Sequence, residues 1–291
     1  MTMTLIVELQ SQAYQIDLNS ALDISIPIRF DEPQVNHFGA PRATSTPLTV
    51  GSYVGSTLKG ASCNADQLSI TPHCNGTHTE CAGHIINESL SVYETLDNTL
   101  CLAQLITVQP VLANESDDSY IPQKEGNDLI ISQSMLVDAI DQAGDSLLSQ
   151  NVEALIIRVL PNTKEKTTYA YSQDNQAAFF SCEAMSYLSR LKITHLLVDL
   201  PSLDRMYDEG LLSNHHCWWN IPQRKNSGLV STANADALLH RTVTELIYVD
   251  ETILDGIFLL NLQVPSIQSD AVPSRPLLFP IQAIRRSPIN I

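Results

Sequence analysis

The sequence is poor in basic residues and has no long apolar run, and both absences limit what the protein can bind. Lysine and arginine number 16 against 32 aspartates and glutamates, which gives a formal net charge of −16. Because nucleic-acid phosphates and anionic membranes repel such a surface, we expect neither a nucleic-acid nor a membrane partner. No apolar stretch approaches the ~20 residues that a membrane-spanning helix needs.

Export signals and a disulfide framework are also lacking. The first ten residues, MTMTLIVELQ, have no basic start and no small-residue cleavage site of the kind found in signal peptides. The cysteines are scattered without regular spacing, at Cys63, Cys74, Cys81, Cys101, Cys182 and Cys217. These features predict a cytoplasmic protein with reduced thiols.

The composition indicates a folded, globular protein. Hydrophobic residues make up 44% of the chain and charged residues 16%, which is typical of globular proteins. A length of 291 residues is at the upper edge of what one core supports, so we predict a single large domain over 1–291, with two packed lobes as the alternative.

The hydrophobic pattern places helices between strands, which predicts an α/β domain. Alternation over 4–18 predicts one or two strands, and apolar runs predict further strands at 99–112, 152–160, 194–200 and 256–264. Helical spacing appears at 132–149, with Ser132 or Ser134 as the cap, and at 181–191. Polar segments at 31–62, 114–128 and 221–236 predict loops.

The stretch from His73 to His84 is the richest in groups that could bind a metal ion. Cys74, His78 and Glu80 share one parity, so on an extended backbone they face one side, and thiolate, imidazole and carboxylate are ligands of zinc and related ions. His84 lies beyond them as a spare titratable group. The competing interpretation is that these histidines are hydrogen-bonded core or surface residues.

A resemblance favours the metal site. The stretch resembles the signature His-x-Gly-Thr-His-x-Asp-x-Pro-x-His of the metal-dependent cyclase family, which includes bacterial kynurenine formamidase. Here it reads Cys74-x-Gly76-Thr77-His78-x-Glu80-x-Ala82-x-His84, so Cys, Glu and Ala replace His, Asp and Pro. Other stretches resemble the family in the same order, at 22–28, 199–205, 215–219, 245–246 and 273–276.

The resemblance implies a fold, a metal site and a reaction. The fold would be a β/β/α arrangement around a mixed, barrel-like sheet. One or two divalent ions, zinc or manganese, would be held by Cys74, His78, Glu80, His215 and Glu245. His216 takes the place of His215 if the register slips by one residue. The reaction would be hydrolysis of an amide, ester or lactone, as in arylformamidases that convert N-formylkynurenine to kynurenine and formate.

The remaining site residues have assigned roles. His84 would move protons as the catalytic acid and base, and Trp218 and Trp219 would stack on an aromatic substrate. The alternatives are another lactone or cyclic-amide hydrolase of the family, or a non-catalytic relative that keeps a structural ion. We also expect a homodimer, to which the N-terminal strands at 1–20 contribute.

Parity predicts that Cys74, and not its neighbour His73, binds the metal. On an extended chain His73 points to the face opposite His78 and Glu80. A bulge before Gly76 would reverse this assignment.

Overall fold

Apolar runs along the chain form the strands of one large mixed sheet. The computed structural model describes residues 4–9, 12–30, 32–143, 152–223 and 234–284. The sheet has eleven strands, and β3 (Leu22–Asp23) pairs with β18 beside the main path. That path runs β1 (Thr4–Leu9), β2 (Gln12–Asp17), β18 (Leu277–Ala283), β16 (Gly256–Asn261), β9 (Leu100–Val108), β12 (Ala154–Val159), β14 (His195–Val198), β15 (Thr242–Glu245), β8 (His78–Cys81) and β17 (Ala271–Pro273).

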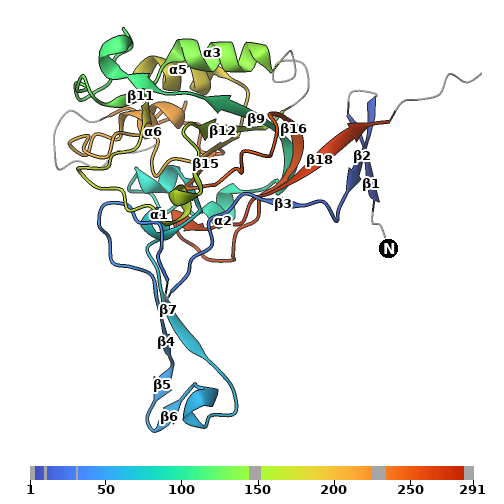
Figure 1. The fold of residues 1–291 in the computed structure, drawn as a ribbon, viewed down its shortest axis with the longest axis vertical. Coiled ribbons are helices and arrows are strands. Elements are labelled where there is room, and N and C mark those ends of the chain that lie inside the picture. The colour runs from blue at the N-terminus through green and yellow to red at the C-terminus, as the bar shows by residue number, and fades with distance from the viewer. Residues whose placement is uncertain (1–3, 10–11, 31, 144–151, 224–233, 285–291) are drawn as a thin grey trace, which may run out of the picture.

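The centre of the sheet is parallel and its flanks are antiparallel. β9, β12, β14 and β15 pair in parallel, while β16 pairs antiparallel with β9 and β8 pairs antiparallel with β15. Parallel neighbours need crossover connections, and α3 (Gln133–Gln142), α5 (Cys182–Arg190) and α6 (Ser213–Trp218) lie within them. Figure 1 shows α3 and α5 together on one side of the sheet. The predicted α/β class with a mixed sheet is confirmed.

Strand alternation divides the core between the two faces of the sheet. On β12, Leu155 and Ile157 pack on the helix side, against residues such as Leu136 of α3 and Leu188 of α5. The intervening Ala154 and Ile156 pack on the opposite side, which is filled by loop and strand residues and not by long helices. All six residues of β12 are buried, as expected for a central parallel strand covered on both faces.

Serine caps fix the starts of the two longer helices. The Ser181 hydroxyl accepts a hydrogen bond from the Ala184 amide of α5 at 2.9 Å, and Ser132 caps α3. Both helices begin where the sequence predicts them. The C-terminal part of the segment 132–149, and most of the loop 221–236, lie outside the described residues.

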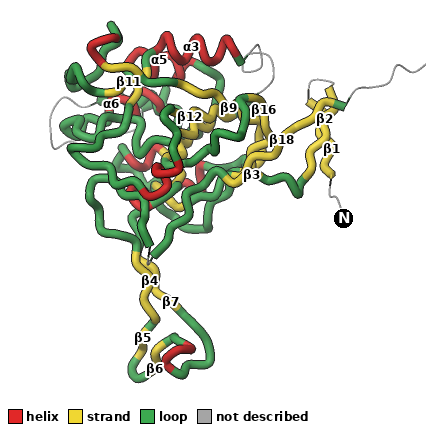
Figure 2. The backbone as a smooth tube through the Cα atoms, viewed as in Figure 1, coloured by secondary structure: helices red, strands yellow, loops and turns green. Residues whose placement is uncertain are grey.

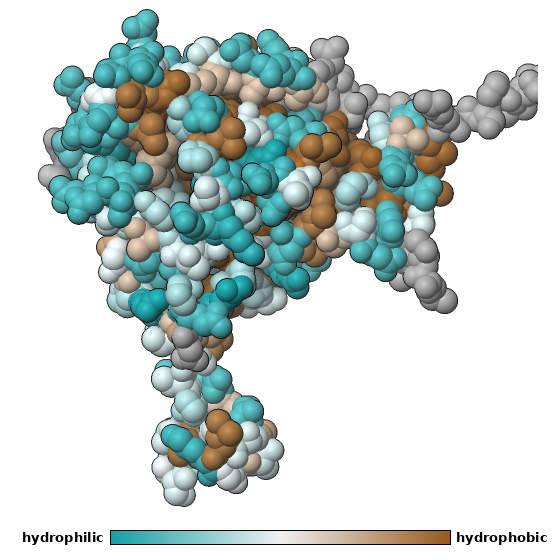
Figure 3. All heavy atoms as spheres, in the orientation of Figure 1, coloured by the Kyte–Doolittle hydropathy of each residue, from teal (hydrophilic) through white to brown (hydrophobic). Residues whose placement is uncertain are grey.

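A narrow arm extends from the body of the protein. It consists of β4 (Thr44–Pro47) paired with β7 (Asp66–Ser69), and of β5 (Thr49–Val50) paired with β6 (Tyr53–Val54). Figure 2 shows this arm projecting away from the sheet, and Figure 3 shows exposed apolar side chains near its tip. Leu58 lies in the 3-10 turn Thr57–Lys59 that follows β6 and is 98% exposed. Residues 32–62 thus combine the predicted loops with short strands and a 3-10 turn.

Shorter elements complete the fold. A small sheet joins β10 (Val111–Leu112), β11 (Leu129–Ile131) and β13 (Phe179–Phe180), and two short helices, α1 (Pro72–Asn75) and α2 (Val92–Thr95), flank β8. The stretch 22–28 that resembles the family contains the two residues of β3 and a single bridge at Ser25. Among the helices that the structure describes, none has the length and apolarity needed to cross a membrane.

Candidate metal centre

Two neighbouring strands place three acidic and imidazole groups in contact. Glu245 of β15 lies directly opposite His78 of β8 in the antiparallel register, and Glu80 follows two residues later on the same face of β8. The Nε2 atom of His78 lies 3.4 Å from Oε2 of Glu245. His78 and Glu80 therefore lie on one face of the strand, as their parity predicts. The side chains of His78, Glu80 and Glu245 are all buried.

Glu245 is followed by a strained residue, and hydrogen bonds hold both the strained turn and the Glu245 carboxylate. Leu246 has a left-handed φ of 54°, which is unfavourable for a branched side chain. Its carbonyl accepts a hydrogen bond from the Thr77 hydroxyl, and the Leu203 amide donates to Oε1 of Glu245 at 2.9 Å. The turn and the carboxylate are thus held from two sides.

Helix α6 brings His215 into the cluster. Its Nδ1 donates to Oδ2 of Asp204 at 2.6 Å, which leaves Nε2 facing Oε1 of Glu80 at 3.0 Å and Oε1 of Glu245 at 3.5 Å. His216 points elsewhere, because its Nδ1 lies 2.9 Å from the carbonyl of Ile221. Of the two histidines that the sequence left open, His215 is the one that reaches the cluster.

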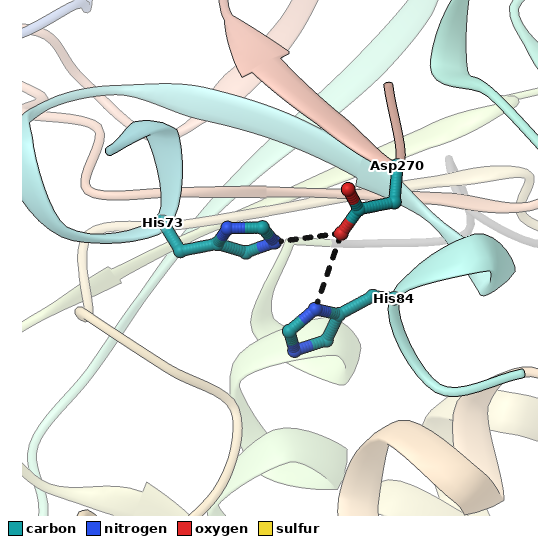
Figure 4. Close-up of side chains that lie close together, drawn as sticks. All are labelled: His73, His84 and Asp270. Carbon is teal, nitrogen blue, oxygen red and sulfur yellow. Dashed lines mark ion pairs between the residues drawn. The ribbon is translucent and has the colours of Figure 1, made fainter. Parts of the chain in front are cut away.

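His73, His84 and Asp270 form an outer group beside these residues. The Oδ2 atom of Asp270 lies 3.2 Å from Nε2 of His73 and 3.5 Å from Nδ1 of His84 (Figure 4). His84 is carried by a 3-10 turn over Ala82–His84, where a Cβ on Gly83 would meet the Leu90 carbonyl at 2.3 Å. This turn therefore requires glycine for close packing.

The structure reverses the predicted placement of Cys74 and His73. Residues 72–75 form the helical turn α1, so the extended backbone that parity assumed is absent there. Nε2 of His73 lies 3.5 Å from Oε2 of Glu80, whereas Cys74 joins none of the groups of possible ligand atoms among the described residues. The physical reason is Pro72, whose fixed φ suits the first position of a helix.

The two tryptophans are also placed differently from the prediction. Trp218 and Trp219 are fully buried in the core on the helix side of the sheet. Trp218 lies under the Arg241 guanidinium, and the Trp219 indole donates to the Arg241 carbonyl and packs 5.7 Å from the ring of His215. They support α6 and offer no exposed face to a substrate, so the predicted stacking role is corrected.

The donor atoms fit a divalent ion by chemistry and by spacing. Three groups of possible ligands lie within 4.8 Å: His78, Glu80 and Glu245; Glu80, His84 and His215; and His73, His84 and Asp270. The buried Nε2 atoms of His78 and His215 and both oxygens of Glu80 have no hydrogen-bond partner other than the neighbouring groups of this site. Since buried polar groups are normally paired, a cation that all of them contact would satisfy them at once.

The charges of the buried side chains also favour a bound cation. Burial opposes ionisation of Glu245, but the adjacent His215 and His78 outweigh it and lower the pKa of this carboxyl. Burial likewise opposes protonation of His215, yet the charge of Glu80 and the hydrogen bond to Asp204 raise its pKa well above the ordinary value. The site therefore favours positive charge among its buried carboxylates.

Sequence reasoning missed three residues of this region. No role is predicted from the sequence for Asp270 or Asp204, and His37 lies in a segment predicted as loop. His37 is buried with both ring nitrogens unpartnered, and burial, opposed by the charge of Glu245, lowers its pKa to about 4. Only Asp204 had a signal, because it ends the Asp-x-Pro-Ser-x-Asp run at 199–204.

Comparisons with known proteins agree on the fold. A "predicted metal-dependent hydrolase" from Bacillus stearothermophilus is 16% identical, with a TM-score of 0.54 over 89% of this chain and 97% of that one. Isatin hydrolase A from Labrenzia aggregata, solved with benzyl benzoate, is 12% identical, with a TM-score of 0.56 over 89% and 93%. A "potential metal-dependent hydrolase with cyclase activity" is 15% identical, with a TM-score of 0.54 over 89% and 98%.

The sequence itself also matches a family, although no curated protein matches it. The model of the family described as "Putative cyclase" matches residues 22–205, more than half of the chain, including β8 and Asp204. His215 and Glu245 lie beyond that match, so their place in the site depends on the structure. The chain belongs to the putative cyclase family.

Proposed function

We propose that this protein is a metal-dependent hydrolase of an amide, ester or lactone. The observation that carries the proposal is the convergence of His78, Glu80, His215 and Glu245, whose buried donor atoms lie close together and largely lack hydrogen-bond partners. Zinc suits this set of imidazoles and carboxylates, and manganese is the alternative. Cys74 is not part of the proposed ligand set.

Each residue has a distinct task in this scheme. Oε1 of Glu80 lies 3.0 Å from Nε2 of His215 and Oε2 lies 3.5 Å from Nε2 of His73, so this carboxylate is suited to bridging two ions. Asp204 holds His215 in the tautomer that leaves Nε2 free to bind. A bound divalent ion supplies Lewis acidity, which polarises a carbonyl group and acidifies water.

His84 is the proposed proton carrier. Its Nδ1 faces Asp270, which as a carboxylate accepts the Nδ1 proton and leaves Nε2 as the basic atom. Nε2 would take a proton from the attacking water and then deliver it to the leaving nitrogen or oxygen. The ring centroid lies 5.5 Å from that of His215, close enough to serve a substrate held at the inner cluster.

For the substrate we propose an aryl formamide, with N-formylkynurenine as the model. The isatin hydrolases among the structural neighbours favour a second candidate, a cyclic amide. The cavity of about 300 Å³ that Tyr169, Tyr171 and Ala177 line is bounded by none of the four proposed ligands, so it offers no aromatic replacement for the buried tryptophans.

A substrate panel on metal-free and zinc-reloaded protein tests this function. Zinc-reloaded wild type should hydrolyse at least one of an aryl formamide, a lactone and a cyclic amide, and the metal-free protein should hydrolyse none. His84→Ala should reduce turnover by about 10²–10⁴-fold, the usual contribution of a general acid–base group. Zinc-loaded protein that is inert on the whole panel would favour a non-catalytic relative, and near-normal turnover of His84→Ala would remove His84 from the mechanism.

We also propose a homodimer. β1 lies at the end of the sheet order with Ile6 exposed, and an edge strand of this kind can pair with a second chain. Light scattering at micromolar concentration should give twice the chain mass of 32.1 kDa. A monomer mass at that concentration would contradict this proposal.

A further inference from the structure

We propose that the cavity beside the carboxyl ends of β9, β12 and β14 binds a small arylalkylamine, a molecule with one aromatic ring and a primary ammonium group. The cavity encloses about 300 Å³, which is at the lower end of the range for ligand pockets and suits a ligand with a single ring. None of the four proposed metal ligands lines it. The site is therefore distinct from the metal centre, and the inference does not depend on the proposed hydrolase function.

The cavity lies where α/β proteins commonly bind their ligands. Pro110 comes two residues after the end of β9, Leu160 follows β12 directly, and Leu200 comes two residues after β14; all three line the cavity. Since these strands are parallel, their carboxyl ends meet at one edge of the sheet. Ligands of open α/β sheets bind outside this edge.

The buried part of the cavity wall is mainly apolar. The side chains of Val159, Ala178 and Leu200 line it, together with the ring of Tyr171, and all four residues are buried. The ring of Tyr169, which also lines the cavity, meets that of Tyr171 edge-on, with 4.9 Å between the centroids. Aromatic rings prefer edge-to-face and offset contacts, so this wall suits the ring of a ligand.

The charge that remains unpaired on the cavity wall is negative. Lys166 lines the cavity, but its Nζ donates to Oδ2 of the buried Asp199 at 2.9 Å and to the Val159 carbonyl at 2.6 Å. Asp199 thus offsets the charge of Lys166. The carboxylate of Glu165, an exposed residue of the same wall, has no ion pair or hydrogen bond with any described residue. An ammonium group beside Glu165 would therefore meet a carboxylate that no other cation neutralises.

The two tyrosines add to the preference for an amine. Tyr171 is only 7% exposed, yet its hydroxyl forms no hydrogen bond with any described residue. Buried polar groups are normally paired, and a ligand nitrogen in the cavity can donate to this hydroxyl. The faces of aromatic rings also attract cations. The net charge of −16 further raises the local concentration of cationic ligands.

Calorimetric titration of the full-length protein with three probes tests the ligand class. Phenethylamine, phenethyl alcohol and hydrocinnamate share a ring and a two-carbon chain and differ in the charge of the end group. Wild type should bind phenethylamine with a Kd below about 1 mM. Phenethyl alcohol should bind about three- to fivefold more weakly and hydrocinnamate more weakly still. A Kd for the amine above that value, equal affinities for amine and alcohol, or tightest binding of the acid would overturn the proposal.

Glu165→Gln tests whether this carboxylate recognises the charge of the amine. The variant should bind phenethylamine about three- to fivefold more weakly than wild type and phenethyl alcohol equally well, because only the amine carries a charge. Glu115→Gln is the matched control, since Glu115 is an exposed glutamate outside the cavity, and it should bind both probes as wild type does. Undiminished affinity of Glu165→Gln for the amine would contradict the proposal.

Two further measurements locate the bound probe. Ala177→Leu adds bulk to the cavity wall and should weaken binding of amine and alcohol alike by at least about tenfold. Unchanged binding would show that the probes bind elsewhere, and if this variant does not fold, the Glu165 comparison still decides. Zinc-free and zinc-reloaded wild type should bind phenethylamine with the same Kd. Binding that requires zinc would place the amine at the metal centre and overturn the cavity site.

Discussion

Asp204 is not a proposed metal ligand, but it orients the proposed ligand His215. Its carboxylate accepts the Nδ1 proton of His215, and it also accepts hydrogen bonds from the Tyr120 hydroxyl and the Asn214 amide. We predict that Asp204→Asn weakens zinc binding by about 10–100-fold, the usual effect of losing a carboxylate that orients a histidine ligand. Competition with a chromophoric chelator measures this affinity.

A control separates orientation of His215 from general loss of stability. Asp118 is a half-buried carboxylate that accepts from the Gln133 amide and the Ser181 hydroxyl, outside the three ligand groups. Asp118→Asn should lower stability but leave zinc affinity unchanged. Equal zinc affinities for the Asp204 and Asp118 variants would contradict the role assigned to Asp204.

Site residues that lie close together in the sequence could be predicted from it. His78 and Glu80 follow from strand periodicity, and Glu80 and His84 from the resemblance within one short motif. Asp270 could not be found this way, because 197 positions separate it from His73 and only the pairing of β17 with β8 brings them together. The error at Cys74 had a visible cause in Pro72, which favours a helical turn over the assumed strand.

Among the elements, α5 is held more firmly at its start than α3. The Ser181 hydroxyl accepts from the Ala184 amide at 2.9 Å and donates to Asp118 at 2.6 Å, whereas Ser132 accepts from the Met135 amide at 3.5 Å. We predict that Ser181→Ala lowers the free energy of unfolding by about 2 kcal/mol and Ser132→Ala by less than about 1 kcal/mol. Urea unfolding of both variants measures the difference, and equal losses would contradict it.

Elements with strong local signals were predicted within a few residues. β12 and α5 lie inside the predicted segments 152–160 and 181–191, because a continuous apolar run and a capped amphipathic pattern are local properties. β3 is short, because Ser25 joins only a single bridge to Ile247 and does not continue the strand. The projection of the arm from the body has no local signal, because exposure depends on where the rest of the chain packs.

At the scale of the whole molecule, acid stability should depend on His195 of β14. Burial lowers its pKa to about 4, with the charge of His240 acting in the same direction, while the unfolded value is about 6.5. Between these values the unfolded chain binds the proton and the folded chain does not, so stability is complete above pH ~6.5 and falls as the pH drops toward 4. The loss from this residue is about 3 kcal/mol.

Thermal unfolding of wild type and His195→Gln between pH 7 and pH 4 checks this dependence. Other groups titrate in the same range, so the difference between the two proteins is the informative quantity. The wild type should lose more stability on acidification than the variant does, because only the wild type carries a buried imidazole at this position. Parallel curves would show that His195 does not contribute.

The measurement that tests the metal centre most directly is zinc binding to wild type and to Glu80→Gln after removal of all metal. Glu80 belongs to two of the three ligand groups, and it is fully buried with both carboxylate oxygens free of hydrogen-bond partners other than the neighbouring groups of this site. Glutamine keeps its size but loses its charge. Wild type should bind zinc tightly, and Glu80→Gln should bind more than about 100-fold more weakly while its circular dichroism stays unchanged. A wild-type protein that binds no zinc or manganese, or a Glu80→Gln protein with undiminished affinity, would contradict a metal centre at Glu80.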